Sequence, residues 1–328
     1  MRTVEPGGLA IDARDLTKTY AAGRGKQPVR ALDGLTLAVP SGQVFGLLGP
    51  NGAGKSTTVK ILTTLARPDS GTATVDGLDV RRDSAAVRHR IGLVSQKPGA
   101  DPVATGRENL TLAGRIQGMT GRQSRRRADE LLERFGLTEA AHRLARTYSG
   151  GMARKLDVAL GLVHRPSVLF LDEPTTGLDP EARSELWQEL QALASVDRMT
   201  VLLTTHYLDE ADHLADRLAI VDHGRVVTEG SPEELKGELR GDRITLDLDD
   251  AALADRAVAC LGSLETLRDL AAEGRTVRAR ADHGGRAVPV VLARLEQAGI
   301  PVASAAVSRP SLDDVYLAHA GRTFEEAA

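Results

Sequence analysis

A glycine-rich segment followed by a lysine and two hydroxyl residues carries the strongest chemical signal in the chain. After the apolar run Val44 to Leu48, the sequence reads Gly49, Pro50, Asn51, Gly52, Ala53, Gly54, Lys55, Ser56 and Thr57. In such a loop, backbone N–H groups close around the β- and γ-phosphates, the lysine reaches the phosphate oxygens, and the serine hydroxyl ligates Mg²⁺. The segment therefore predicts a nucleoside triphosphate site in which Lys55 binds phosphate and Ser56 binds Mg²⁺.

Two adjacent carboxylates follow a second apolar run. The residues Val168 to Leu171 predict a buried strand, and Asp172 and Glu173 stand at its end. Carboxylates in that position are costly unless a cation or a water molecule uses them. We therefore expect Asp172 to hold Mg²⁺ through its water shell, and Glu173 to orient and deprotonate the water that attacks the phosphate.

Strands and helices alternate around these two segments. The predicted strands are Leu9 to Ala13, Thr36 to Val39, Val44 to Leu48, Val168 to Leu171, Val201 to Thr204 and Leu218 to Val221. A helix is expected from Lys55 to Leu65, and a helical block from Thr105 to Leu137 is broken at Gly118 and Gly121. This alternation predicts an α/β fold with a mostly parallel sheet that helices cover on both faces.

The overall charge and the distribution of apolar residues argue against two properties, nucleic-acid binding and membrane spanning. The 328 residues carry a formal charge of −3, from 42 basic and 45 acidic side chains, so we expect no nucleic-acid partner. No run approaches the roughly 20 apolar residues of a membrane span. If the chain serves a transporter, the channel must therefore be another polypeptide.

Four further stretches complete a recognisable order along the chain. They are Gln96, the segment Tyr148-Ser149-Gly150-Gly151-Met152, the segment Gly177-Leu178-Asp179, and His206. With these stretches the chain resembles the nucleotide-binding subunits of ATP-binding cassette (ABC) transporters. The resemblance implies a P-loop ABC cassette that uses ATP and Mg²⁺, with a helical subdomain at about residues 97–165.

The resemblance also implies roles for single residues. Gln96 would touch Mg²⁺ or the attacking water, and His206 would contact the γ-phosphate. Tyr20 lies 29 positions before Gly49, where ABC ATPases place an aromatic residue that stacks on adenine. Asp179 corresponds to a loop that crosses a dimer interface in this family.

The Ser-Gly-Gly segment implies a homodimer. Ser149, Gly150 and Gly151 open a helix, and a helix N-terminus attracts phosphate. In the family, two subunits face each other head to tail, so that each signature closes the ATP site of the other. This chain has Tyr148 and Met152 where the family consensus has Leu and Gln. The Tyr-Ser-Gly-Gly-Met form is similar to that of antibiotic-resistance exporters of the daunorubicin type.

The chain is predicted to contain two domains: the cassette at 1–240 and a small C-terminal α/β domain at 241–328, read as strand, helix, strand, helix, strand. The small domain is either a packing appendage or a regulatory or dimer-supporting unit. The resemblance implies the ATPase subunit of a drug or natural-product exporter, located peripherally at the cytoplasmic face of the cell membrane beneath a separate permease. Two alternatives stay open, a soluble ABC ATPase without a permease and an importer subunit.

Overall fold

The computed structural model describes residues 8–21, 27–239, 241–321 and 324. The chain divides into two compact units, one that extends to Pro232 and includes Phe324, and a second that begins at Glu233. This division falls at the start of helix α8 (Pro232–Glu238), a few residues before the predicted domain limit. Among the described residues, no helix has the length and apolar character that a membrane span requires.

A six-stranded sheet forms the centre of the first unit. Its strands, in spatial order, are β10 (Arg225–Gly230), β9 (Arg217–Asp222), β3 (Val44–Leu48), β8 (Thr200–Thr205), β7 (Val168–Asp172) and β6 (Ile91–Val94). Every pairing is parallel except that of β10 with β9. The central strands are continuous apolar runs because both of their faces are buried. The mostly parallel α/β sheet predicted from the sequence is confirmed.

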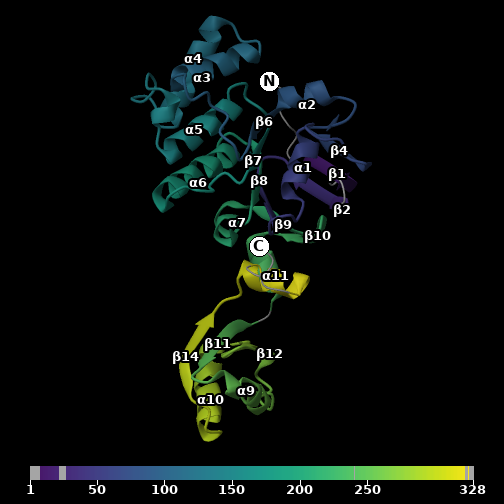
Figure 1. Cartoon of the computed structure of the whole chain (residues 1–328), viewed down its shortest axis with the longest axis vertical. Helices are drawn as coiled ribbons and strands as arrows, with labels where there is room; N and C mark the ends of the chain where they lie inside the picture. Colours follow the sequence, from purple (N-terminus) through teal and green to yellow (C-terminus); the bar gives the residue numbers. More distant parts are fainter. Residues whose placement is uncertain (1–7, 22–26, 240, 322–323, 325–328) are drawn as a thin grey trace. The chain divides into compact units, whose positions relative to one another are not determined.

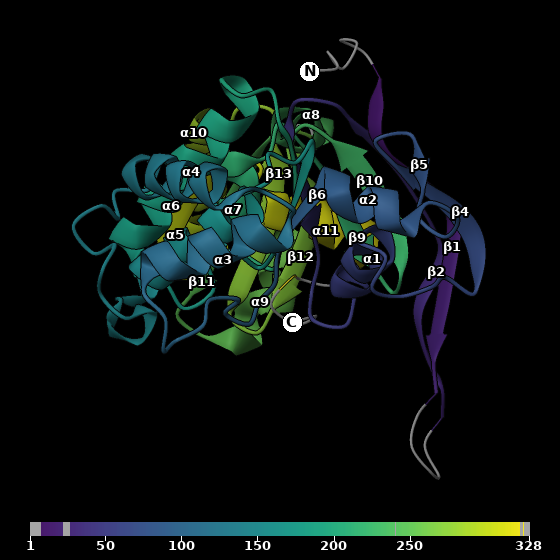
Figure 2. The ribbon, with the colours of Figure 1, turned by 90° about the horizontal axis from the view of Figure 1, so that it is seen from above.

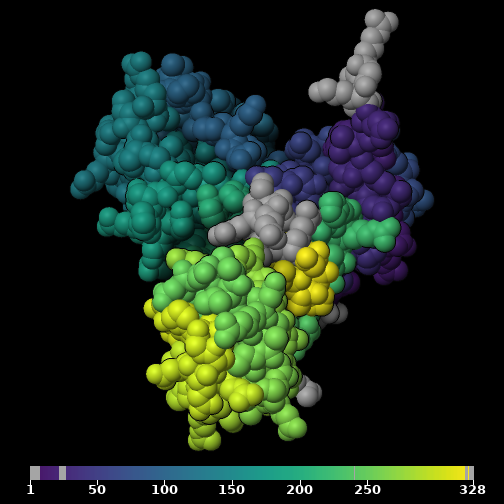
Figure 3. Space-filling view, turned by 60° about the horizontal axis from the view of Figure 1, so that its bottom comes forward, coloured from purple at the N-terminus to yellow at the C-terminus, as the bar shows by residue number. Residues whose placement is uncertain are grey.

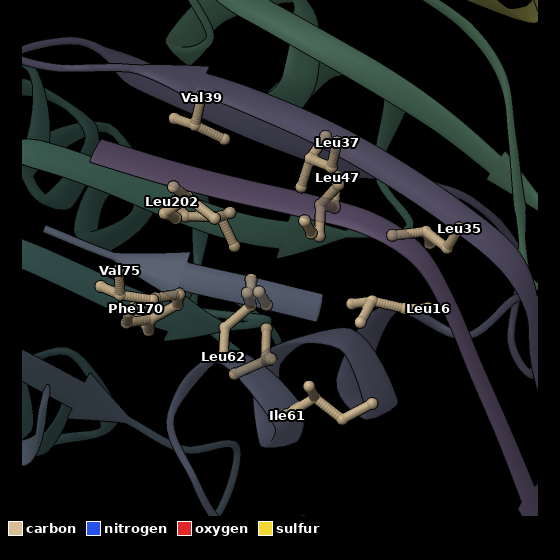
Figure 4. Close-up of a cluster of buried hydrophobic side chains, with 14 of the residues drawn as sticks. Leu16, Leu35, Leu37, Val39, Leu47, Ile61, Leu62, Val75, Phe170 and Leu202 are labelled. Atoms are coloured by element: carbon tan, nitrogen blue, oxygen red, sulfur yellow. The ribbon is translucent and has the colours of Figure 1, made fainter. Parts of the chain in front are cut away.

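A second, antiparallel sheet packs over helix α1 (Lys55–Leu62). It contains β2 (Val29–Pro40), β1 (Leu9–Tyr20), β4 (Ser70–Val75) and β5 (Leu78–Asp79), in that order. Figure 4 shows the core between the two sheets, where side chains such as Leu16, Leu35 and Val75 meet Leu47 and Phe170. Leu62 of α1 joins the same cluster, so the helix that begins at the phosphate loop is anchored in this core. Helix α2 (Ser84–Arg90) precedes β6.

Helices on the other side of the six-stranded sheet build the helical region of this unit (Figure 2). They are α3 (Gly106–Ile116), α4 (Gly121–Arg134), the short turn η1 (Ala145–Thr147), α5 (Gly150–Gly161), α6 (Pro180–Ser195) and α7 (Leu208–Leu214). Capping boxes begin α3 at Thr105 and α4 at Thr120. The predicted break at Gly118 is confirmed, because this residue has a φ of 82° in the turn between the two helices.

The second unit is a four-stranded antiparallel sheet, the green-to-yellow body in Figures 1 and 3. Helices α9 (Ala254–Leu261) and α10 (Gly284–Gln297) pack on one face of the sheet, whereas Asp314 of α11 (Leu312–Ala320) pairs with Arg243 and Arg280 on the other face. The strand order is β12 (Arg268–Glu273), β13 (Thr276–Ala281), β11 (Asp242–Leu248) and β14 (Val302–Ser308), and the turn η2 (Ala251–Leu253) precedes α9. The prediction missed β12, whose mostly exposed residues include three charged side chains and show no apolar alternation.

Candidate functional site

The phosphate loop folds tightly around the ammonium group of Lys55. Lys55 Nζ donates to the carbonyl oxygens of Gly49, at 2.6 Å, and Pro50, at 3.0 Å, and only 4% of the residue is exposed. Gly54 has a φ of 111°, and a Cβ added there would lie 2.6 Å from the Ala31 carbonyl oxygen. Only glycine therefore fits the turn that starts α1.

Burial and nearby carboxylates have opposite effects on the Lys55 ammonium group. Burial lowers the pKa of the Lys55 ammonium, while the nearby Glu173 and Asp172 carboxylates act in the opposite direction. A buried ammonium group at the N-terminus of a helix attracts a polyphosphate, which can form charged hydrogen bonds there.

Hydroxyl and carboxylate oxygens meet at the ends of α1, β7 and β8. Ser56 Oγ donates to Asp172 Oδ1 over 3.1 Å, and Thr204 Oγ1 donates to the same oxygen over 2.6 Å. Mg²⁺ prefers such oxygen ligands and is held in proteins by one or two carboxylates together with substrate phosphates. The residues predicted to bind Mg²⁺ are Ser56, Asp172 and Gln96. The structure brings the oxygens of Ser56 and Asp172 into contact, and these two are suited to the ion, whereas the Gln96 amide donates to Glu173.

Glu173 lies at the meeting point of three segments. Its Oε2 accepts a hydrogen bond of 3.1 Å from Gln96 Nε2, and its Oε1 lies 3.2 Å from His206 Nδ1. Gln96 follows β6 and His206 follows β8, so the parallel sheet places these two residues on either side of Glu173. The three residues predicted to be catalytic are thus neighbours, although their separate roles stay predictions.

The backbone of Glu173 is strained. Its φ of 49° is left-handed, a conformation that costs a non-glycine residue roughly 1–3 kcal/mol. The Glu173 N–H donates to the carbonyl oxygen of Thr204, at 3.2 Å, and to Thr204 Oγ1, at 3.1 Å. These contacts hold the turn that directs the carboxylate toward Gln96 and His206.

The signature segment and the Asp179 loop lie against each other at two helix N-termini. Ser149 Oγ caps α5 by accepting from the Met152 N–H, and Asp179 Oδ1 caps α6 by accepting from the Ala182 N–H. A Cβ on Gly151 would approach Ala182 Cβ to 2.8 Å, so glycine is needed for this close packing. Within one subunit, the side chains of Ser149 and Asp179 thus serve as helix caps. Contact of either residue with a partner's nucleotide stays a prediction.

Three other residues of interest have simpler surroundings. Tyr20 ends β1 with 37% of its surface exposed, and Lys18 Nζ lies 5.6 Å from its ring centroid. Tyr148 donates its hydroxyl to the Ala140 carbonyl oxygen over 2.7 Å, which explains how an aromatic residue replaces the consensus leucine. Met152 packs against the helical core. Stacking of Tyr20 on adenine stays a prediction.

Comparison with known proteins decides the family. The family model for ABC transporters matches residues 32–176, and a model for the C-terminal domain of ATP-binding proteins like DrrA1-3 matches residues 230–320. The daunorubicin resistance ATP-binding protein DrrA3 of Streptomyces coeruleorubidus is 49% identical over 305 residues, which cover 91% of this chain and 94% of the relative. The chain belongs to the DrrA-like family of ABC ATP-binding proteins.

Further relatives agree with this assignment. The linearmycin resistance ATP-binding protein LnrL of Bacillus subtilis is 34% identical over 96% of this chain and 100% of its own length. A solved structure titled as a dimeric post-hydrolysis state of the ATP-binding cassette MJ0796, bound to ADP and Pi, matches with a TM-score of 0.62 and 28% identity. That match covers 67% of this chain and 98% of the other. The predicted resemblance and fold class are confirmed, and this DrrA-like chain is an ABC ATPase.

The sequence interpretation missed several polar residues that support the site of this ABC ATPase. Thr204 contacts both Asp172 and Glu173 but was predicted only as part of a strand. Arg154 and Asp157 lie on α5 with 8% and 6% of their surfaces exposed. A charged pair three residues apart, among the apolar residues Leu156, Val158 and Ala159, was the available signal for these buried side chains.

Proposed function

We propose that this DrrA-like chain is the ATP-hydrolysing subunit of an exporter of drugs or natural products. The convergence of Gln96 and His206 on Glu173, beside the contact between Ser56 and Asp172, is the observation that supports hydrolysis most strongly. Export is supported by relatives named for resistance to daunorubicin and linearmycin. These two relatives are named for different drugs, and we assign the selection of the drug to a separate permease.

In the proposed reaction, each residue of the site has a separate task. Lys55 holds the β- and γ-phosphates, and Ser56 and Asp172 would hold Mg²⁺, which would neutralise negative charge on the phosphates. Glu173 accepts a proton from the attacking water, which Gln96 helps to position. His206 stabilises the γ-phosphate as charge develops on it. Tyr20 stacks on the adenine.

The active species in this proposal is a homodimer. Ser149 and Gly151 of one subunit complete the ATP site of the other, and Asp179 lies at the interface between them. The dimeric cassette named above, solved with ADP and Pi, supports this arrangement. The close packing of the N-termini of α5 and α6 puts the signature beside the Asp179 loop.

Mixed subunits test the homodimer. A Lys55→Ala subunit has no phosphate-binding lysine, and a Ser149→Arg subunit has no functional signature, so each homodimer is inactive. A heterodimer of the two has one intact composite site, and we expect ATP hydrolysis to return on mixing. Light scattering and a tag on each subunit establish that heterodimers form. Heterodimers without activity would contradict the composite site.

A groove in the helical region suits the membrane partner. A cavity of about 410 Å³ is lined by β6, α3 and α5, and its lining includes Leu65, Ala113 and Gln117. Leu65 in this lining is 65% exposed, and Ile116, which directly precedes the lining residue Gln117, is 75% exposed. Exposed apolar side chains beside a hollow mark a protein interaction site. We assign this groove to a cytoplasmic loop of the permease, so the chain would lie peripherally at the cytoplasmic face of the cell membrane.

Co-purification tests the permease assignment. The chain is expressed with the membrane protein of about six spans that a neighbouring gene is expected to encode, and retention on the tagged membrane protein is measured. Leu65→Asp should abolish retention, whereas Val196→Asp, which changes an exposed valine after α6, should not. An ATPase that no membrane protein retains would favour the soluble alternative.

A further inference from the structure

The buried arginine Arg154 connects the signature helix α5 to the catalytic turn. Its Nε donates to the Pro174 carbonyl oxygen over 2.6 Å, and its Nη1 donates to the Ser95 carbonyl oxygen over 2.7 Å. Nη2 donates to the carbonyl oxygens of Asp172 and Glu173, each at 3.3 Å. One guanidinium thus holds four main-chain carbonyl groups from two segments that are far apart in the sequence.

These carbonyl groups belong to residues at or beside the predicted catalytic groups. Ser95 directly precedes Gln96, and Asp172, Glu173 and Pro174 form the turn in which Glu173 has its left-handed φ of 49°. A strained conformation persists only where its surroundings hold it firmly. Because Arg154 contacts the carbonyl of Glu173 itself, it acts on the orientation of that residue.

Asp157 holds the other side of the Gln96 segment. Its Oδ1 accepts hydrogen bonds from the N–H groups of Gly99, at 2.9 Å, and Ala100, at 3.1 Å. Asp157 also lies 4.0 Å from Arg154, one helical turn away on α5. The segment that carries Gln96 is therefore fixed to α5 both before and after the glutamine.

We propose that Arg154 is a positioning residue, which fixes Glu173 and Gln96 of its own subunit relative to the signature helix that faces the partner's nucleotide. This inference rests on the proposed function, in which Ser149 at the start of α5 contacts the ATP of the other subunit. Occupancy of one ATP site then acts through α5 on the catalytic residues of the second site.

The geometry makes Arg154→Lys the informative change. Lysine keeps the positive charge but is a point charge on a flexible stem, and it cannot reproduce the planar fork that serves carbonyl groups in several directions. A small misplacement of catalytic groups costs rate more than binding, so we expect turnover at saturating ATP to fall roughly 10- to 100-fold. The ATP dissociation constant should change by less than about threefold, because Lys55 still binds the phosphates.

Arg127 on α4 provides a matched control. It is also a partly buried arginine whose guanidinium donates to main-chain carbonyl oxygens of the α5 end, those of Leu162 at 2.9 Å and Val163 at 3.1 Å. Arg127→Lys removes similar contacts far along α5 from the signature. We expect a comparable decrease in the thermal unfolding midpoint with turnover within about twofold of wild type. An equal loss of turnover in both variants would reduce Arg154 to a purely structural role.

Mixed subunits decide whether Arg154 acts in its own subunit. In the heterodimer described above, the Ser149→Arg subunit supplies the intact phosphate loop and the Lys55→Ala subunit supplies the intact signature. Arg154→Lys placed in the phosphate-loop subunit should lower turnover, and the same change in the signature subunit should lower it far less.

The activity of the heterodimers distinguishes a failure of the positioning role from a failure of the proposed function. If the parent heterodimer is inactive, the composite site itself fails. If the parent heterodimer is active and Arg154→Lys lowers turnover only in the signature subunit, or in neither, the positioning role is wrong. Circular dichroism of each variant shows whether a loss arises from misfolding; a folded Arg154→Lys subunit with unchanged turnover also overturns the proposal.

Discussion

Replacement of Glu173 by glutamine separates chemistry from binding in this ABC ATPase. Glutamine has the same shape but cannot accept a proton from water. Its carbonyl oxygen can still accept from Gln96 Nε2, which lies 3.1 Å from Glu173 Oε2, and its amide can face His206 Nδ1, which lies 3.2 Å from Glu173 Oε1. The ground-state contacts of the site should therefore survive in Glu173→Gln.

The size of the effect follows from the task assigned to Glu173. A positioned general base contributes roughly 10²- to 10⁴-fold to the rate, which corresponds to about 2.7–5.5 kcal/mol of barrier. Phosphate release by Glu173→Gln should fall by that factor while calorimetry shows ATP affinity close to wild type. Because turnover would open the proposed homodimer, light scattering should show a closed dimer accumulating with Mg-ATP.

Two controls accompany this measurement. Glu181→Gln, which changes an exposed carboxylate near the start of α6, should hydrolyse ATP at the wild-type rate. Circular dichroism checks that both variants are folded. Turnover of Glu173→Gln near the wild-type rate would refute the assignment and move the role of base to His206 or Gln96.

Two further predictions concern binding and stability. Lys55→Ala should weaken ATP binding by roughly 1.5–3 kcal/mol, or about 10- to 150-fold in calorimetry, because a charged hydrogen bond to phosphate is lost. The control Lys60→Ala, on the exposed side of α1, should bind ATP normally. Tight ATP binding by Lys55→Ala would contradict the assignment of Lys55 to the phosphates. Burial raises the pKa of the Glu210 carboxyl above its ordinary value, so the stability contributed by its protonated form is present at low pH and is lost as pH rises through the folded-state pKa. Glu210→Gln should therefore show a smaller decrease in melting temperature between pH 5 and pH 8 than wild type, as measured by calorimetry, and an unchanged pH dependence would mean that Glu210 is ionised throughout.

The local chemistry of the cassette could be predicted because it depends on short segments with fixed spacing. The phosphate loop, the end of β7 and the residues after β6 and β8 each combine an apolar run with a polar residue, and parallel pairing then brings these ends together. The contact of Ser56 with Asp172 and that of Gln96 with Glu173 follow from this topology.

The tertiary contacts of buried polar residues could not be predicted, even where the charged pair on α5 signalled that such residues are there. Arg154 interacts with main-chain carbonyl groups, which leave no trace in the side-chain pattern of their own segments. Strand β12 lies at the edge of its sheet, where charged and exposed residues replace the apolar alternation of a central strand. The role of Arg154 thus depends on packing between distant segments, whereas β12 is held by pairing with β13, the next strand in the sequence.

Drug transport into inside-out membrane vesicles tests the account most directly. The vesicles contain the permease with either the wild-type chain or Glu173→Gln, and uptake of a panel of drugs that begins with daunorubicin is followed after ATP is added outside. The account predicts ATP-dependent uptake of at least one drug with the wild-type chain, and none with Glu173→Gln or with the permease alone. Uptake that is unchanged by Glu173→Gln, ATP-driven movement out of the vesicles, or movement of no drug at all would contradict it.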